Sequence, residues 1–153
     1  MDKLTIRTFH VFNAPAATVW ALLADFGAIE RWWPTEGELV IDRIELEGQG
    51  IGMVRRIFNR GAARAVSERL DRLDEVEKVL QLSILGPDPL RTAWYQATGR
   101  IVEMDEGRCR LDYESEFTAP RGRENQMRDG ILAAYRAMFT GLQNSVDAAR
   151  APA

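Results

Sequence analysis

Two residues of opposite charge, Arg55 and Glu68, occupy positions that alternate with apolar residues in two strand-like segments. Successive strand side chains point to opposite faces, so Arg55 shares a face with Ile57, and Glu68 shares one with Val66. A carboxylate on an inner face needs a hydrogen-bond donor, or its pKa rises. Because neighbouring antiparallel strands place opposed Cβ atoms about 5 Å apart, we predict an inner-face Arg55–Glu68 ion pair. Its role, architectural or part of a site, stays open, since both kinds of pair look alike in a sequence.

Two tyrosines lie on the same face of two different strands of the predicted sheet. Alternation places Tyr95 and Tyr113 inward, together with aliphatic residues such as Leu82. An apolar lining with a few convergent polar groups is typical of small-molecule sites. If the protein is an enzyme, Glu68, Arg55 and the two phenols are its acid/base groups, and they would shift protons in a cyclisation or dehydration.

The sequence also argues against several kinds of site. His10 is the only histidine and Cys109 the only cysteine, so we expect no metal site and no disulfide. We find no glycine-rich phosphate-binding motif, and therefore expect no nucleotide or other cofactor. The net charge is −3 without a basic block, which argues against nucleic acid or an anionic membrane as partner.

The N-terminal residues lack a long apolar run, and no stretch of about 18 apolar residues occurs elsewhere. A single cysteine fits a reducing compartment. These features predict a cytoplasmic protein without a membrane span.

The pattern of elements predicts one α+β domain over residues 1–153. A strand at 4–12 precedes a short helix at 16–25 and a second short helix or turn before Pro34. Turn residues then separate six strands at 38–47, 51–58, 63–73, 76–85, 90–104 and 108–118. On the strand at 63–73 we expect Arg72 or its neighbour to share the face of Glu68. Apolar residues at three- and four-residue steps predict a long helix at 121–149, which must lie across the sheet.

Small residues form a stripe along this last helix. Such a stripe either lets the helix pack closely or leaves volume for a ligand, and we favour close packing, because mid-helix glycines each cost about 1 kcal/mol that close contact would offset. The stripe consists of Gly130, Ala134, Ala137, Gly141 and Ser145.

Four local motifs, in this order, resemble the START-like (SRPBCC) superfamily, which includes the birch-pollen allergen, plant abscisic-acid receptors and polyketide cyclase/dehydrase-like bacterial proteins. They are Asn-Ala-Pro at 13–15 followed by Val-Trp at 19–20, Asp-Phe at 25–26 running to Trp-Trp-Pro at 32–34, Gly-Ile-Gly-Met-Val-Arg at 50–55, and Ser-Glu-Arg-Leu at 67–70 with Asp74. The resemblance implies a helix-grip fold. A curved seven-stranded antiparallel sheet wraps around the long C-terminal helix, with two short helices between the first two strands, and leaves a cavity.

The resemblance also implies site residues. Glu68 matches a glutamate that contacts ligand in the abscisic-acid receptors, and Tyr95 matches their pocket tyrosine. Trp33 stands where those receptors have a lysine for the hormone's carboxylate, and their gate sequence is replaced by Asn-Arg-Gly-Ala-Ala at 59–63. These departures argue against abscisic-acid reception. Whether residues 59–63 form a loop that gates the cavity stays an open question. The expected ligand-binding residues are Trp33, Arg55, Ile57, Val66, Glu68, Leu82, Tyr95, Tyr113, Ala134 and Met138.

Three functions follow as hypotheses. The first is binding of a small hydrophobic or aromatic molecule, as carrier, sensor or sequestering protein. The second is a cofactor-independent polyketide cyclase or dehydratase. The third is a protein-interaction scaffold that uses exposed aromatic residues around Trp32 and Trp33, and a homodimer is compatible with all three.

Overall fold

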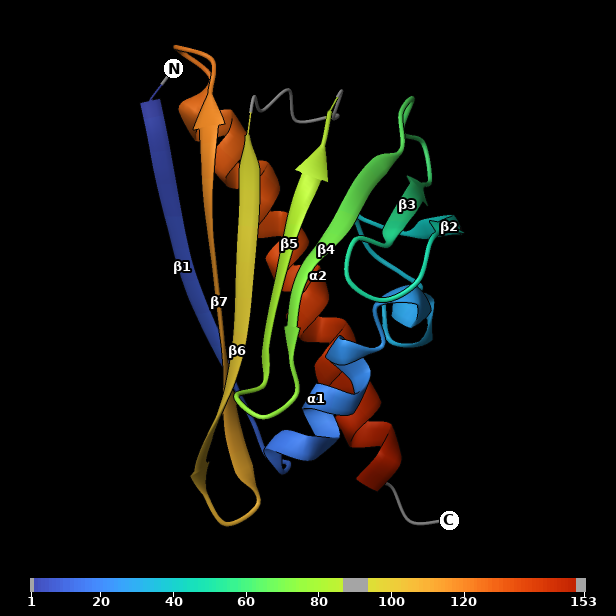
Figure 1. The fold of residues 1–153 in the computed structure, drawn as a ribbon, viewed down its shortest axis with the longest axis vertical. Helices are drawn as coiled ribbons and strands as arrows, with labels where there is room; N and C mark the ends of the chain where they lie inside the picture. The colour runs from blue at the N-terminus through green and yellow to red at the C-terminus, as the bar shows by residue number, and fades with distance from the viewer. Residues whose placement is uncertain (1, 87–93, 151–153) are drawn as a thin grey trace.

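The computed structural model describes residues 2–86 and 94–150, which form a sheet, a long helix and two short helices (Figure 1). No helix in this described part is long and apolar enough to cross a membrane. The elements in chain order are β1 (Asp2–Phe12), α1 (Ala16–Ala24), the 3₁₀ helix η1 (Phe26–Arg31), β2 (Ile41–Glu47), β3 (Val54–Asn59), β4 (Val66–Asp74), β5 (Val79–Leu85), β6 (Tyr95–Asp105), β7 (Arg108–Ala119) and α2 (Glu124–Arg150).

All seven strands belong to one antiparallel sheet in the order β1-β7-β6-β5-β4-β3-β2. Strands β2 to β7 therefore form a meander, and β1 pairs with the last strand. The helix α2 runs diagonally across the concave side of this curved sheet (Figure 1). The predicted helix-grip fold is thereby confirmed.

One end of the space between α2 and the sheet is solidly filled, and we call it the filled half. Helix α1 closes it, because α1 contacts β6, β7 and α2. The N-terminus of α1 is held by Glu103, whose carboxylate accepts a hydrogen bond from the backbone N–H of Ala16 at 2.9 Å. The filled half contains side chains with at most 1% of their surface exposed, among them Phe12, Val19, Leu111, Leu142 and Val146.

The helix α2 lies very close to the segment after η1 at Gly141. A Cβ atom at this position would overlap the backbone carbonyl of Trp32 and lie 2.8 Å from the ring of Pro34. The absence of a side chain thus lets the segment after η1 lie directly on the helix. Close packing was expected from this stripe of small residues, but the partner is this segment rather than the sheet.

Several element boundaries differ from those expected. Strands β2, β3, β4 and β5 each begin three residues later than predicted, and α2 also begins three residues later. Glycines with positive φ, including Gly50 at 66° and Gly52 at 92°, hold the connection before β3 in turn conformations that a strand does not adopt. Strand β6 begins at Tyr95, and the predicted start of this strand at residue 90 lies outside the described residues.

A β-bulge in β4 decides whether Arg72 or its neighbour Leu73 faces inward. The register shifts between Leu70, which opposes Leu82, and Arg72, which opposes Gln81. Arg72 therefore turns to the outer face, and Leu73, partly buried against the core, takes the inner position. The residue that shares the inner face with Glu68 is therefore Leu73 and not Arg72.

Candidate ligand cavity

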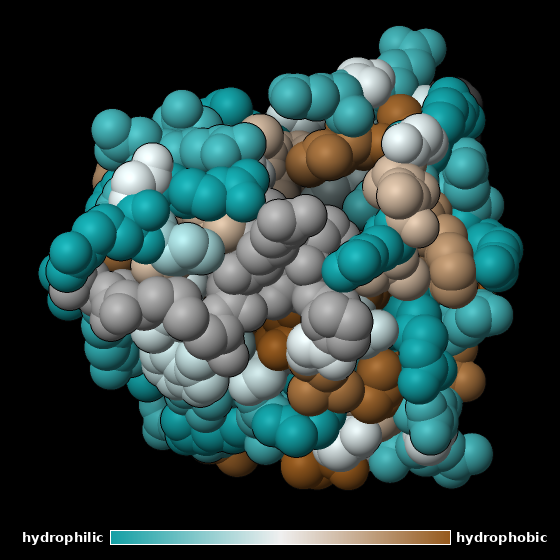
Figure 2. Space-filling model, turned by 90° about the horizontal axis from the view of Figure 1, so that it is seen from above, coloured by the Kyte–Doolittle hydropathy of each residue, from teal (hydrophilic) through white to brown (hydrophobic). Residues whose placement is uncertain are grey.

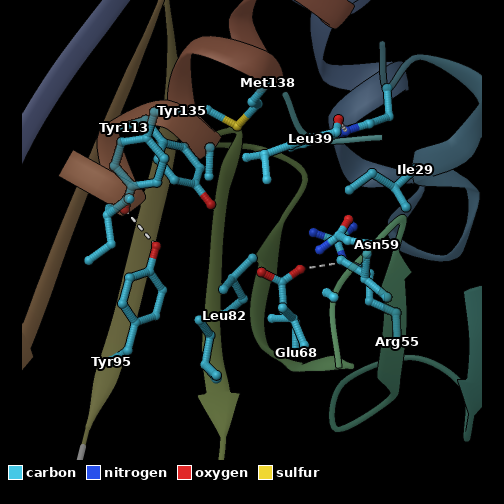
Figure 3. A pocket seen from close by; sticks show the side chains of 18 of the residues that line it. Ile29, Leu39, Arg55, Asn59, Glu68, Leu82, Tyr95, Tyr113, Tyr135 and Met138 are labelled. Carbon is cyan, nitrogen blue, oxygen red and sulfur yellow. Dashed lines mark hydrogen bonds and ion pairs between the residues drawn. The ribbon is translucent and has the colours of Figure 1, made fainter. Parts of the chain in front are cut away.

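The other half of the space between sheet and helix is hollow. A cavity of about 370 Å³ lies between the inner faces of β3 to β7 and the first half of α2. Figure 3 shows its side chains converging from both sides, with tyrosines on one wall and the Arg55–Glu68 pair on the other. The volume falls in the usual range of small-molecule sites, about 300–1,000 Å³.

All ten residues expected to bind ligand lie on the wall of this cavity, and they come from the segment after η1, from β3 to β7 and from α2. That they contact a ligand remains a prediction. The wall also includes residues that were not predicted for the site. These are Leu23, Ile29, Trp32, Leu39, Asn59, Arg60, Gly61, Ala62, Leu80, Ile84, Gly130, Ile131 and Tyr135.

The predicted ion pair is present and inward-facing. Arg55 and Glu68 oppose each other in the β3–β4 register, and the Arg55 Nε–Glu68 Oε1 distance is 2.8 Å. Their side chains are only 8% and 16% exposed. Arg55 also donates from Nη1 to the carbonyl oxygen of Phe26 at 2.8 Å, and its guanidinium lies 3.8 Å from the centroid of the Phe26 ring. One side chain thus ties β3 to β4 and to η1, so the pair has an architectural role whatever else it does.

Three tyrosines form a polar cluster on the opposite wall (Figure 3). The hydroxyl oxygens of Tyr95 and Tyr135 are 2.6 Å apart, and the Tyr113 ring packs edge-on against the Tyr135 ring. Burial raises the pKa of Tyr95 and Tyr113 well above the usual value, and the neighbouring Tyr135 phenol raises both further. Burial also raises the pKa of Tyr135, to about 12. All three phenols are therefore neutral at physiological pH and can donate or accept hydrogen bonds.

The hydroxyl of Ser115 lies beside this cluster. It is buried and has no partner with hydrogen-bond geometry among the described residues, although its proximity lowers the pKa of Tyr135. Gly99, on the neighbouring strand, leaves room for the Tyr113 ring, because a Cβ atom at Gly99 would lie 3.1 Å from it.

The cavity is bordered by short segments rather than by regular elements on one side. Trp33 lies on this side of the cavity, and its ring Nε1 donates to the carbonyl oxygen of Leu39 at 2.9 Å. Residues 59–62 of the β3–β4 connection contribute to the same border, with Gly61 at φ 77°. Figure 2 shows apolar surface emerging at this end of the molecule among hydrophilic residues.

The small residues of α2 have two different environments. Gly130 and Ala134 line the cavity, whereas Gly141 is in close contact with the segment after η1. The stripe therefore borders a cavity in the first half of the helix and permits close packing in the second half, against the segment after η1 rather than against the sheet.

His10 is held by contacts with α2 and is not among the residues that line the cavity. Its Nε2 lies 2.9 Å from Gln143 Oε1, and its ring stacks on Phe139. Among residues 2–86 and 94–150, no group of three or more His, Cys, Asp or Glu side chains could hold a metal ion.

A family model described as polyketide cyclase/dehydrase and lipid transport matches residues 3–147. The chain belongs to this family. A comparison with curated proteins found no match.

Several solved structures have the same fold. Norcoclaurine synthase from Thalictrum flavum matches with a TM-score of 0.79 and 16% identity, over 98% of each chain. The Zhui aromatase/cyclase from Streptomyces sp. R1128 matches with a TM-score of 0.76 and 18% identity, over 95% of this chain and 94% of that chain. A protein from Thermobifida fusca is 28% identical, with a TM-score of 0.71, over 83% of this chain and 82% of that one.

Proposed function

We propose that this member of the polyketide cyclase/dehydrase and lipid transport family binds a small apolar or aromatic molecule in the cavity, as a carrier, sensor or sequestering protein. The observation that carries the proposal is a cavity of about 370 Å³ with a mainly apolar wall and few convergent polar groups. A structure of norcoclaurine synthase in complex with dopamine and hydroxybenzaldehyde supports it, because that protein of the same fold accepts small aromatic molecules.

The polar groups of the wall suit binding better than proton transfer. A general base works best with a pKa near the operating pH, but burial raises the pKa of all three phenols. The carboxylate of Glu68 is already paired with Arg55. These groups can orient a ligand through hydrogen bonds without any change in protonation.

Filling the cavity tests the proposal. Ala134→Phe adds a ring from the α2 side of the wall, and it should weaken binding of the uncharged dye N-phenyl-1-naphthylamine by at least about tenfold. Thr140→Phe, on the exposed face of the same helix, is the matched control and should bind like the native protein. The measurement is dye fluorescence in a titration, with thermal unfolding of each variant alongside.

Equal dye binding by the native protein and Ala134→Phe would contradict the proposal. Mass spectrometry of the native protein, purified under non-denaturing conditions, would identify a molecule that copurifies with it. Such a molecule should be lost from Ala134→Phe and kept by Thr140→Phe.

The second candidate is a cofactor-independent cyclase or dehydratase. It is favoured by the inward position of Glu68, since an outward carboxylate would leave the cavity without an acidic group. The shared fold with an aromatase/cyclase supports it as an analogy only. This candidate predicts that the native protein turns over a poly-β-ketone substrate. Tyr95→Phe or Glu68→Gln should abolish this turnover, whereas both variants should still bind the dye.

The burial of Trp32 argues against the scaffold hypothesis. Trp32 is 5% exposed and donates from Nε1 to the carbonyl oxygen of Leu22. Trp33 is partly buried and borders the cavity. The two rings pack against each other, and Trp32 contributes no exposed aromatic surface to a partner.

A further inference from the structure

The charges that face the cavity are arranged as one compensated pair. Arg55 and Glu68 are 2.8 Å apart at Nε and Oε1, and both side chains are largely buried. The other charged residue on the wall, Arg60, has an exposed side chain that is paired with Asp42 at 3.4 Å. The described part of the wall therefore carries no net charge in its buried portion.

The pair still offers unused hydrogen-bonding capacity. Nε of Arg55 donates to Glu68, and Nη1 donates to the carbonyl oxygen of Phe26. Among the described residues, no hydrogen bond engages Nη2 of Arg55 or Oε2 of Glu68. A guanidinium has five N–H donors and a carboxylate has about four acceptor sites. A ligand oxygen can therefore accept from this arginine, and a ligand hydroxyl can donate to this glutamate.

A charged ligand gains little from the same arrangement. A carboxylate near the pair is attracted by Arg55 and repelled by Glu68 at a similar distance, and an ammonium group experiences the reverse. These Coulomb contributions largely cancel, while the cost of removing the ion from water remains.

The tyrosine wall leads to the same conclusion. Tyr95 and Tyr135 share one hydrogen bond, in which one hydroxyl donates and the other accepts. The accepting phenol keeps an O–H that can donate elsewhere, and both oxygens keep lone pairs. No formal charge on this wall balances an ionic ligand.

We infer that the cavity selects uncharged apolar or aromatic ligands whose polar groups are hydroxyls or carbonyls, and that it discriminates against carboxylates and amines of the same shape. This inference rests on the proposed binding function and names the ligand class for that cavity. The matched charges of Arg55 and Glu68 are the element of the wall that sets this preference.

Four two-ring probes of similar size test the inference in the native protein: naphthalene, 2-naphthol, 2-naphthoate and 2-naphthylmethylamine. At about pH 7 the first two are neutral, the third is an anion and the fourth a cation. Competition against N-phenyl-1-naphthylamine should show 2-naphthol binding at least about tenfold more tightly than either ion, and more tightly than naphthalene. An ion that binds as tightly as 2-naphthol would overturn the inference and leave the proposed function intact. No displacement by any probe, together with no dye binding, would overturn both.

Two variants then change the charge balance in opposite directions. Glu68→Gln leaves Arg55 uncompensated, so the affinity for 2-naphthoate relative to 2-naphthol should rise by about tenfold or more. Arg55→Gln leaves Glu68 uncompensated and should shift the preference toward 2-naphthylmethylamine by a similar factor. Glu116→Gln, on the outer face of β7, removes a negative charge outside the cavity and should leave all four affinities unchanged. Unaltered charge preference in a folded Glu68→Gln variant would contradict the inference, and the native-protein comparison stands if either pair variant fails to fold.

Discussion

Along α2, the second half of the helix faces solid core, and the first half faces a cavity. Met138 borders the hollow, whereas Leu142, one turn further along, is fully buried in the filled half. The two regions share the same sheet, the same helix and the same kinds of residue. The two halves therefore have different roles. The packed side chains of the filled half hold the helix on the sheet, so the fold does not depend on packing in the half that contains the cavity.

The largest expected effect comes from making the same substitution in both halves. Leu111 in β7 lies in the filled half, and Leu82 in β5 lines the cavity, yet both are at most 1% exposed. Leu111→Ala should lower the free energy of unfolding by about 3–5 kcal/mol, since it loses contacts on all sides and leaves a new void. Leu82→Ala should cost less, about 1–2 kcal/mol, because its side chain already has an empty side. Denaturant unfolding at equilibrium measures both values, and equal costs would show that the two halves do not differ in packing.

The next effect concerns the helix contact at Gly141. Replacing glycine by alanine in a helix interior normally stabilises it by about 1 kcal/mol. Here the added methyl group would overlap the Trp32 carbonyl and the Pro34 ring, so Gly141→Ala should instead destabilise the protein by about 1–3 kcal/mol.

Asn144→Ala, at an exposed position on the same helix, provides the control. It gains helix propensity without an overlap and should leave the free energy of unfolding unchanged or slightly higher. A Gly141→Ala variant as stable as Asn144→Ala would mean that the segment after η1 can move away at no cost.

The smallest effect is a loss of stability at alkaline pH, to which both halves contribute. Burial raises the pKa of the Cys109 thiol in the filled half from 9.0 to about 11, and it raises the pKa of Tyr135 at the cavity from 10.0 to about 12. A group with a raised pKa in the folded state stabilises the fold fully below its unfolded pKa, and this contribution is lost as the pH rises through the folded pKa. The free energy of unfolding should therefore begin to fall near pH 9 for Cys109 and near pH 10 for Tyr135.

Substitution separates the two contributions. Cys109→Ala should remove the decline that begins near pH 9 and keep the one near pH 10. Tyr135→Phe should keep the former and only reduce the latter, because the pKa values of Tyr95 and Tyr113 are raised as well. Denaturant unfolding at a series of pH values is the measurement. Stability that is independent of pH up to about 11 in the native protein would contradict the assigned burial.

The sequence alone predicted the succession of strands and the Arg55–Glu68 contact because both depend on local signals. Alternation assigns each strand residue to a face, and short connections force neighbouring strands to pair. The β-bulge after Leu70 escaped prediction, because an extra residue that reverses the alternation leaves no mark in composition.

The position of the boundary between the cavity and the filled half could not be predicted from the sequence either. Gly130, Ala134 and Gly141 belong to one stripe, yet the first two border a cavity and the third is in tight contact. The periodicity of α2 places Tyr135 on its buried face but does not show that this residue lines a cavity. Helical spacing identifies the buried face of α2, whereas the volume left between that face and the sheet depends on the segment after η1 and on the sheet's curvature.

The three tyrosines of the chain all line the one cavity, and this gives the protein a set of natural reporters. Selective isotopic labelling of tyrosine would produce a magnetic resonance spectrum of three rings, every one of them on the wall. A molecule that enters the cavity would shift these signals without any need to assign the rest of the spectrum. Cys109, the single cysteine, lies apart in the filled half. The rate at which a thiol reagent modifies it would therefore report on opening of that half alone.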